Sequence, residues 1–162
     1  MAEHIFNLET PEETTAFATE LGARLGPGDT LLLDGPVGAG KSHFARALIG
    51  SHLARAGLAE DIPSPTFTLV QTYHVGPLEL WHADLYRLST PQEVAELGLI
   101  DAFASALCLV EWPDRLGPAL LPKRHLWLSL DHGPTETARI LVAKPSPAWP
   151  HPMPQALAGH GR

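Results

Sequence analysis

Cysteine is almost missing from this chain of 162 residues, which contains only Cys108. A single cysteine excludes a disulfide within the chain and leaves no set of thiolates for a structural zinc site. Cys108 stands inside an apolar run, so we expect it to be a small side chain of the core.

Long hydrophobic runs are missing as well. No uninterrupted apolar stretch approaches the roughly twenty residues that a membrane-spanning helix needs. The first residues also lack the basic segment followed by an apolar one that marks a secretory signal. We therefore expect a cytoplasmic protein that makes no membrane contact.

Positive charge is scarce. The chain has 11 lysines and arginines against 18 aspartates and glutamates, and its formal net charge is -7. Such a chain has no overall positive field to attract a phosphate backbone. We expect no autonomous nucleic-acid binding.

The chain does contain the pattern of a phosphate-binding loop, or P-loop. Residues 35–42 read GPVGAGKS, which fits G-x-x-x-x-G-K-[ST], and they follow an apolar run over 30–34 that predicts a buried strand. Its glycines allow successive N–H groups to converge on phosphate oxygens at the start of the next helix. Lys41 can then bridge the β- and γ-phosphates, and the Ser42 hydroxyl can bind Mg²⁺. The alternative is a chance match in a glycine-containing loop, which the flanking strand and helix patterns disfavour.

Capping signals and periodicity divide the remaining chain into elements. Two capping boxes, at 10–13 and 90–93, predict helices that reach about Leu25 and Leu97. We also expect a helix over 41–57 and a short one capped by Asp101. The strand patterns begin with an edge strand at 5–8 and the buried strand at 30–34. A hairpin follows, whose first strand ends at 73 and whose second strand covers 78–83. The last patterns are a buried strand at 106–110 and an antiparallel pair at 126–130 and 138–142.

These elements predict an α/β protein with the three-layer P-loop NTPase fold, with parallel strands in the centre of the sheet and antiparallel strands at its margins. The length allows one substantial core and not two. We assign residues 1–143 to a single P-loop ATPase domain. Prolines at 145, 147, 150, 152 and 154 interrupt any later pattern, so we predict that residues 144–162 form a disordered tail.

Two carboxylates, Asp84 and Glu111, are candidates to support the P-loop. Each stands where a predicted strand ends, and in α/β sheets ligands bind beyond the carboxyl ends of the strands. A P-loop site needs carboxylates to hold Mg²⁺ or to orient water. Asp84 could instead cap the turn that follows it, and Glu111 could form a surface salt bridge.

Thr66 is a further candidate. A hydroxyl on a mobile loop senses the γ-phosphate in some P-loop proteins, and the prolines on either side of Ser64 predict a shaped turn here. A turn hydroxyl with no ligand is an equally open alternative.

Five segments of the chain closely resemble, in their order and spacing, the TsaE family. This family, also called YjeE, comprises bacterial ATPases required for the threonylcarbamoyladenosine (t6A) modification of tRNA. The resemblance extends from about Thr10 to about Val142, and the ordered set is specific although each segment after the P-loop is weak alone. The segments are GPVGAGKS, SPTFTLV, HADLYRL, ELGLIDAF and LVEWPDRL.

The resemblance implies an ATP site with Mg²⁺ as cofactor. It implies that Lys41, Asp84 and Glu111 are catalytic, and that Ser42, Glu111 and Asp84 lie on the metal side. Of the two carboxylates it favours Glu111 for the metal and Asp84 for hydrolysis. It also implies that the start of the first helix lies near the nucleotide base. The nucleotide-binding residues would then be Thr10, Glu12, Gly35, Pro36, Val37, Gly38, Ala39, Gly40, Lys41, Ser42, His43 and Thr66.

The resemblance also implies protein partners. These are TsaD, which transfers the threonylcarbamoyl group to the adenosine beside the anticodon, and its scaffold TsaB, so that tRNA is met only indirectly through the complex. Trp112 and the Tyr86-Arg87 pair are our candidates for passing the nucleotide state to a partner. Two positions depart from the family pattern: Pro36 replaces an acidic residue and Ser42 replaces threonine, which leaves ATP affinity open.

Two other functions stay open on the residues alone. A small-molecule kinase would use the same P-loop, but it would need an arginine-bearing lid, and no arginine-rich segment is evident. A nucleotide-dependent binding module with negligible turnover would differ from a slow ATPase only in its rate.

Overall fold

Seven strands form one mixed sheet in the computed structural model, which describes residues 3–154. Their order is β1-β7-β6-β2-β5-β4-β3. The central strands β6, β2, β5 and β4 are parallel neighbours, whereas β1, β7 and β3 pair antiparallel at the two margins. The predicted α/β fold class is therefore confirmed. The strands are β1 (His4–Leu8), β2 (Thr30–Asp34), β3 (Val70–Val75), β4 (Leu78–Asp84), β5 (Leu107–Glu111), β6 (His125–His132) and β7 (Arg139–Pro145).

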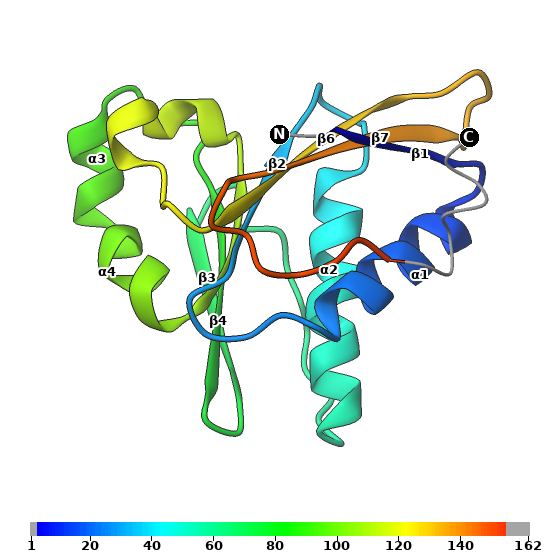
Figure 1. Cartoon of the computed structure of the whole chain (residues 1–162). Coiled ribbons are helices and arrows are strands. Elements are labelled where there is room, and N and C mark those ends of the chain that lie inside the picture. The colour runs from blue at the N-terminus through cyan, green and yellow to red at the C-terminus, as the bar shows by residue number, and fades with distance from the viewer. Residues whose placement is uncertain (1–2, 155–162) are drawn as a thin grey trace.

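Helices cover both faces of this sheet (Figure 1). The helices α1 (Pro11–Gly22) and α2 (Lys41–Arg55) lie on one side, and α3 (Pro91–Glu96) and α4 (Leu99–Ser105) lie on the other. Two 3₁₀ turns, η1 (Pro113–Leu116) and η2 (Pro118–Leu120), follow β5. Within residues 3–154, no helix has both the length and the apolar character to cross a membrane.

The helix starts follow the predicted caps with one exception. The Thr10 hydroxyl accepts a hydrogen bond from Glu13 N, and Thr90 forms a complete capping box with Glu93. The prediction that Asp101 caps a helix was wrong, because α4 begins after Gly98 and Asp101 is an exposed residue of its first turn. Gly98 has φ 82°, and this left-handed conformation lets α3 end and α4 begin within a few residues.

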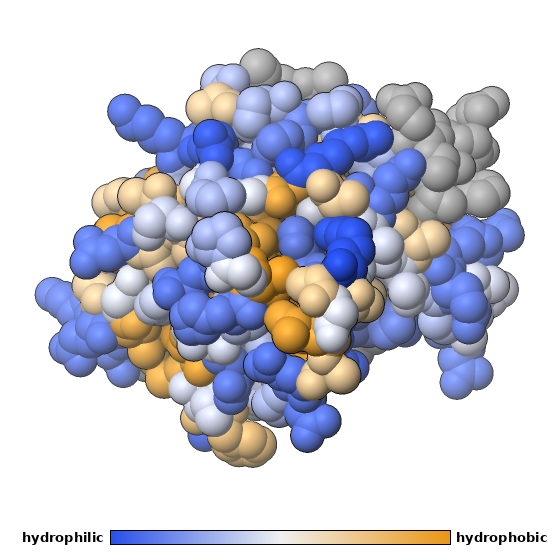
Figure 2. Space-filling model, turned by 90° about the horizontal axis from the view of Figure 1, so that it is seen from below, coloured by the Kyte–Doolittle hydropathy of each residue, from blue (hydrophilic) through white to orange (hydrophobic). Residues whose placement is uncertain are grey.

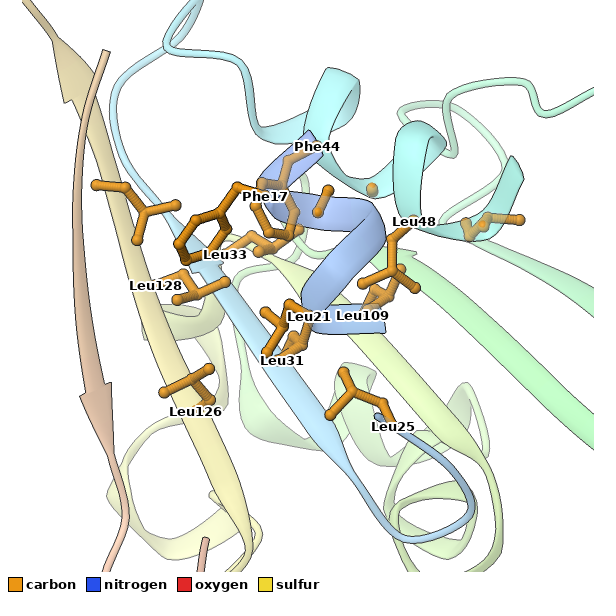
Figure 3. Packing of buried hydrophobic residues seen from close by; sticks show 14 of the residues in the cluster. Phe17, Leu21, Leu25, Leu31, Leu33, Phe44, Leu48, Leu109, Leu126 and Leu128 are labelled. Carbon is orange, nitrogen blue, oxygen red and sulfur yellow. The ribbon is translucent and has the colours of Figure 1, made fainter. Parts of the chain in front are cut away.

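The core has two layers because successive residues of a buried strand point to opposite faces of the sheet. Leu31 and Leu33 of β2 face α1 and α2, where they join Phe17 and Phe44 in the cluster shown in Figure 3. Leu32 faces the other way, into a cluster with α3 and α4. The second cluster includes Cys108, so the expected core role of the cysteine is confirmed. Burial raises the pKa of the Cys108 thiol to about 12, so the thiol is protonated at neutral pH.

The chain after Lys144 is ordered over much of the predicted tail. The last strand runs on to Pro145, Trp149 is only 9% exposed and packs into the α1–α2 core cluster, and His151 Nε2 lies 2.8 Å from Asp29 Oδ2. The prediction of disorder was therefore wrong for residues 144–154, while residues 155–162 lie outside the described residues. Prolines prevent a helix here, but they do not prevent an extended segment from docking through its aromatic and polar side chains.

The two ends of the sheet differ in what they present. The P-loop joins β2 to α2 at the top of Figure 1, at the carboxyl ends of the parallel strands. Figure 2 looks at the opposite end, where hydrophobic side chains form patches among hydrophilic ones. A ligand site of the kind that α/β sheets carry is therefore to be sought at the P-loop end.

Candidate nucleotide site

The P-loop occupies the turn between the most central buried strand and α2. Gly35 has φ 140°, and a Cβ atom at this position would lie 2.1 Å from the carbonyl oxygen of Leu130 on β6. Gly40, with φ 102°, is the N-cap residue of α2 and contributes no side-chain cap to the first N–H groups of the helix. Glycine is needed at 35 because the loop crosses the neighbouring strand too closely for any side chain.

Lys41 is buried under the loop. Its Nζ donates hydrogen bonds to the carbonyl oxygens of Gly35 and Pro36, at 2.5 and 3.0 Å, and it lies 4.2 Å from the ring centroid of Trp112. Burial lowers the pKa of the Lys41 ammonium, an effect that the charges of Glu111, Asp34 and Asp84 oppose. Lys41 at the loop therefore interacts electrostatically with three carboxylates.

Ser42 and Glu111 meet directly beside this lysine. The Ser42 hydroxyl lies 3.1 Å from both carboxylate oxygens of Glu111, and His82 Nε2 lies 2.7 Å from Oε2 of the same carboxylate. Glu111 is only 3% exposed. The alternative that Glu111 forms a surface salt bridge is thus excluded.

Asp84 stands next to Glu111 across the β4–β5 pairing. Its Oδ1 accepts a hydrogen bond from Tyr86 N at 2.9 Å, so it does cap the turn that follows it. Its Oδ2 accepts a hydrogen bond from the Thr66 hydroxyl at 3.3 Å, and Thr66 in turn lies 2.8 Å from the Ser64 hydroxyl. The turn-capping interpretation of Asp84 is therefore confirmed for Oδ1. Its other oxygen faces Thr66, and a role of Asp84 toward Mg²⁺ or water stays a prediction.

These residues surround one pocket of about 470 Å³. Nine of the residues predicted for the site line it: Val37, Gly38, Gly40, Lys41, Ser42, His43, Thr66, Asp84 and Glu111. Gly35, Pro36 and Ala39 belong to the same loop without lining the pocket, and Ala39 is fully buried.

Thr10 and Glu12 do not line this pocket. The first turns of α1 nevertheless contact a residue that does, because His43 Nε2 lies 3.3 Å from the carbonyl oxygen of Pro11 and 3.1 Å from the Thr15 hydroxyl. The start of α1 is therefore beside the pocket rather than in its wall.

Several residues of the site were not predicted as binding residues. Arg46, Tyr86 and Trp112 also line the pocket. Trp112 has φ 59°, an uncommon conformation for a residue other than glycine, and it brings the indole over Lys41. From β7, Arg139 donates hydrogen bonds to the carbonyl oxygens of Gly38 and Ala39, at 3.3 and 3.0 Å, and no local pattern marks that contact.

The donor set fits Mg²⁺ only in the company of a phosphate ligand. Within residues 3–154, no group of three His, Cys, Asp or Glu side chains could hold a metal ion by itself. Mg²⁺ is usually bound through one or two carboxylates together with water and substrate phosphates, all of them oxygen ligands. The Ser42 hydroxyl and the carboxylates of Glu111 and Asp84 line one pocket and supply oxygen donors of this kind.

A glycine-rich loop between a central parallel strand and a helix, at the carboxyl edge of a mixed sheet, defines an α/β protein with the P-loop fold. The family model of TsaE, described as threonylcarbamoyl adenosine biosynthesis protein TsaE, matches residues 8–140. The chain belongs to the TsaE family, and this places it in the biosynthesis of t6A in tRNA.

Individual relatives agree with this assignment. The chain is 42% identical to tRNA threonylcarbamoyladenosine biosynthesis protein TsaE of Rickettsia bellii over 107 residues, which are 66% of this chain and 72% of that protein. It is 41% identical to the Bacillus subtilis protein of the same name over 103 residues, 63% of this chain and 61% of the relative. The crystal structure of B. subtilis YdiB matches with a TM-score of 0.69 and 29% identity, covering 88% of this chain and 84% of YdiB.

Proposed function

We propose that the protein is a Mg²⁺-dependent ATPase that supports the t6A modification of the adenosine beside the anticodon by acting on a complex of TsaB and TsaD. One observation carries the ATPase part of the proposal. Lys41, Ser42, Asp84 and Glu111 come from three separate elements and line a single pocket at the P-loop. A loop that binds phosphates, a lysine, a hydroxyl and two carboxylates are the parts that ATP hydrolysis at a P-loop uses.

Each side chain has a role in this proposal. The N–H groups of the loop and the Lys41 ammonium bind the phosphates of ATP. Ser42 and Glu111 hold Mg²⁺, which neutralises charge on the phosphate oxygens when it is bound. Asp84 orients the attacking water, and Thr66 reports the γ-phosphate through its hydrogen bond to Asp84.

The partner part of the proposal rests on the family and on the surface around the pocket. Val37, Phe67 and Tyr86 are large hydrophobic residues that are 75, 79 and 48% exposed, and they belong to the P-loop, to the segment after Thr66 and to the turn after Asp84. Exposed apolar side chains of this kind favour contact with a protein. With a net charge of -7, contact with tRNA would be indirect, through TsaB and TsaD.

The test is an ATP hydrolysis assay on the full chain, alone and with TsaB and TsaD. The expected result is release of phosphate that the partners stimulate and that depends on Mg²⁺. Formation of ADP only in the presence of an added small-molecule acceptor would favour a kinase instead. Binding of ATP without any release, even with the partners, would favour a binding module.

A further inference from the structure

His82 is a buried polar residue that the proposed function does not use. It is completely buried on β4, and its Nε2 lies 2.7 Å from Glu111 Oε2. Because an ionised carboxylate only accepts hydrogen bonds, the hydrogen of this bond is on Nε2. His82 therefore donates to the carboxylate that we assign to Mg²⁺.

The sheet explains why the two side chains meet. In the parallel pairing of β4 with β5, His82 is opposite Leu109 and Asp84 is opposite Glu111. Alternate residues of a strand point to the same face, so His82, Asp84 and Glu111 all face the side of the sheet that α2 covers. Since β4 pairs with strands on both sides, the backbone of His82 is held more firmly than a loop would hold it.

The Glu111 carboxylate needs such a partner. A glutamate side chain turns about three bonds, and its oxygens are placed only if something binds them. In the described residues its side-chain partners are the Ser42 hydroxyl and His82. Ser42 is assigned to Mg²⁺ in the proposed function and so cannot also fix Glu111 in the loaded site, which leaves His82.

Packing alone does not account for a histidine at this position. The other ring nitrogen, Nδ1, is buried and has no hydrogen-bond partner within residues 3–154. Burying a polar atom without a partner is unfavourable, so an apolar side chain would serve the core better. Among the described residues, the hydrogen bond to Glu111 is the interaction that requires the imidazole.

We propose that His82 is a positioning residue that orients the Glu111 carboxylate toward Ser42 and the P-loop, and so sets the Mg²⁺ dependence of nucleotide binding. The inference rests on the proposed Mg²⁺-dependent ATPase. Loss of a side chain that orients a metal ligand typically costs roughly tenfold to a hundredfold in metal affinity or activity.

The experiment compares His82→Leu and His82→Gln with the wild-type full chain by calorimetric titration of ATP in EDTA and in Mg²⁺. His82→Leu should leave the affinity in EDTA unchanged and reduce the enhancement by Mg²⁺ roughly tenfold or more. His82→Gln, whose amide can still donate, should recover most of the enhancement. In a Glu111→Gln background, His82→Leu should add nothing, because the two side chains act as one unit.

The matched control is His52→Leu. His52 is also a buried histidine, its Nε2 lies 2.8 Å from the carbonyl oxygen of Gly22, and it does not line the pocket. It should change stability and leave the Mg²⁺ enhancement at the wild-type level. If His82→Leu behaves like this control, or if His82→Gln is as impaired as His82→Leu, His82 is only a packing residue and the inference is overturned.

Nitrogen NMR of the ligand-free protein gives a readout that needs no nucleotide and no substitution. It should find the His82 hydrogen on Nε2, and a hydrogen on Nδ1 alone would overturn the inference even if every variant failed to fold. The failure of the proposed function looks different. In that case the wild type itself would show no Mg²⁺-dependent binding of ATP, and both proposals would fall together.

Discussion

Two buried carboxylates, each with a histidine at hydrogen-bond distance, lie at opposite ends of the sheet. Glu111 ends β5 beside the P-loop and is bonded to His82, whereas Asp29 precedes β2 and is bonded to His151. Their burial is alike, at 3 and 1% exposed. Their other neighbours differ, and this difference distinguishes Glu111, in a candidate site, from Asp29, in a structural cluster.

Asp29 is enclosed by groups that hold the fold together. Its Oδ2 also accepts a hydrogen bond from Gly26 N at 2.8 Å, and Arg124 Nε lies 2.9 Å from its Oδ1. Arg124 in turn donates to the carbonyl oxygens of Pro27 and Gly28. Asp29 thus links the turn before β2, the start of β6 and the C-terminal segment.

Glu111 faces groups that a ligand can recruit. It lies beside the Ser42 hydroxyl on the first turn of α2, and it lines the pocket. Its charge also interacts with the Lys41 ammonium. The same pair of residue types therefore stabilises the fold at one end and prepares a site at the other. Whether such a pair stabilises the fold or belongs to a site depends on the end of the parallel strands at which it lies, because ligands bind at the carboxyl ends.

The largest expected effect on stability comes from removing Asp29, the buried carboxylate that is hydrogen-bonded to His151. Asp29→Ala removes the partner of Arg124, of His151 and of a backbone N–H, so it should lower the free energy of unfolding by about 3 kcal/mol. Denaturant unfolding followed by circular dichroism measures this. A loss below about 1 kcal/mol, the value of an exposed pair, would contradict the structural role.

Glu111→Gln is the counterpart at the other end. It keeps the shape of the side chain, so the free energy of unfolding should change by less than about 1 kcal/mol, as for a substitution that leaves hydrogen bonding possible. The dependence of ATP binding on Mg²⁺ should weaken, which titrations at several Mg²⁺ concentrations measure. An unchanged Mg²⁺ dependence would remove Glu111 from the metal site.

Trp149→Ala tests the C-terminal segment that His151 anchors. Removing a packed indole should cost about 3 kcal/mol of stability. Trp149→Phe is the control, since it keeps a ring in the core and deletes an indole N–H that has no partner among the described residues. Thermal unfolding of the pair would measure the difference, and equal melting temperatures for Ala and wild type would show that the segment does not dock.

Lys41→Ala tests the charge at the P-loop. Loss of a charge-assisted contact to phosphate should cost about 1.5–3 kcal/mol of binding free energy, a reduction of roughly tenfold to over a hundredfold in ATP affinity. The fold should survive, because within residues 3–154 the hydrogen bonds of the Lys41 ammonium go to carbonyl oxygens of its own loop. Calorimetric titration of ATP measures the change, and an ATP affinity equal to that of the wild type would exclude the proposed role of Lys41 in phosphate binding.

Asp84→Asn separates hydrolysis from binding. The amide keeps the shape and one acceptor oxygen for Tyr86 N, so ATP should still bind, while phosphate release falls at least roughly tenfold, about 1.4 kcal/mol on the barrier. Steady-state hydrolysis with TsaB and TsaD measures it. If Asp84→Asn and Glu111→Gln both hydrolyse ATP at the wild-type rate, the two carboxylates are structural.

The smallest effect is a pH dependence of stability at His52. Burial lowers the pKa of His52, against the opposing hydrogen bond to Gly22, so the folded state prefers the neutral ring. The unfolded chain then binds the proton first, and stability falls as the pH drops below the ordinary histidine pKa of about 6.5 and levels off below the folded pKa. The difference in unfolding free energy between wild type and His52→Gln should be constant above about pH 6.5 and should change only at acid pH.

The sequence by itself was enough for most features that depend on neighbours along the chain, with the cap assigned to Asp101 as an exception. The P-loop pattern, the capping boxes at Thr10 and Thr90, and the alternation of β2 determine local backbone structure within a few residues. Strand ends also marked Asp84 and Glu111, because a polar residue that closes an apolar run stands at the edge of the sheet.

Only the tertiary structure decided which distant residues meet. His82 and Glu111, Arg139 and Ala39, and His151 and Asp29 are separated by 29, 100 and 122 positions. Such contacts depend on the strand order, which brings β4 beside β5 and β7 beside β6, and no local period encodes it. The docked segment after Pro145 escaped prediction for the same reason: its prolines are a local signal against regular structure, whereas the buried surface that holds Trp149 exists only once the sheet and helices have packed.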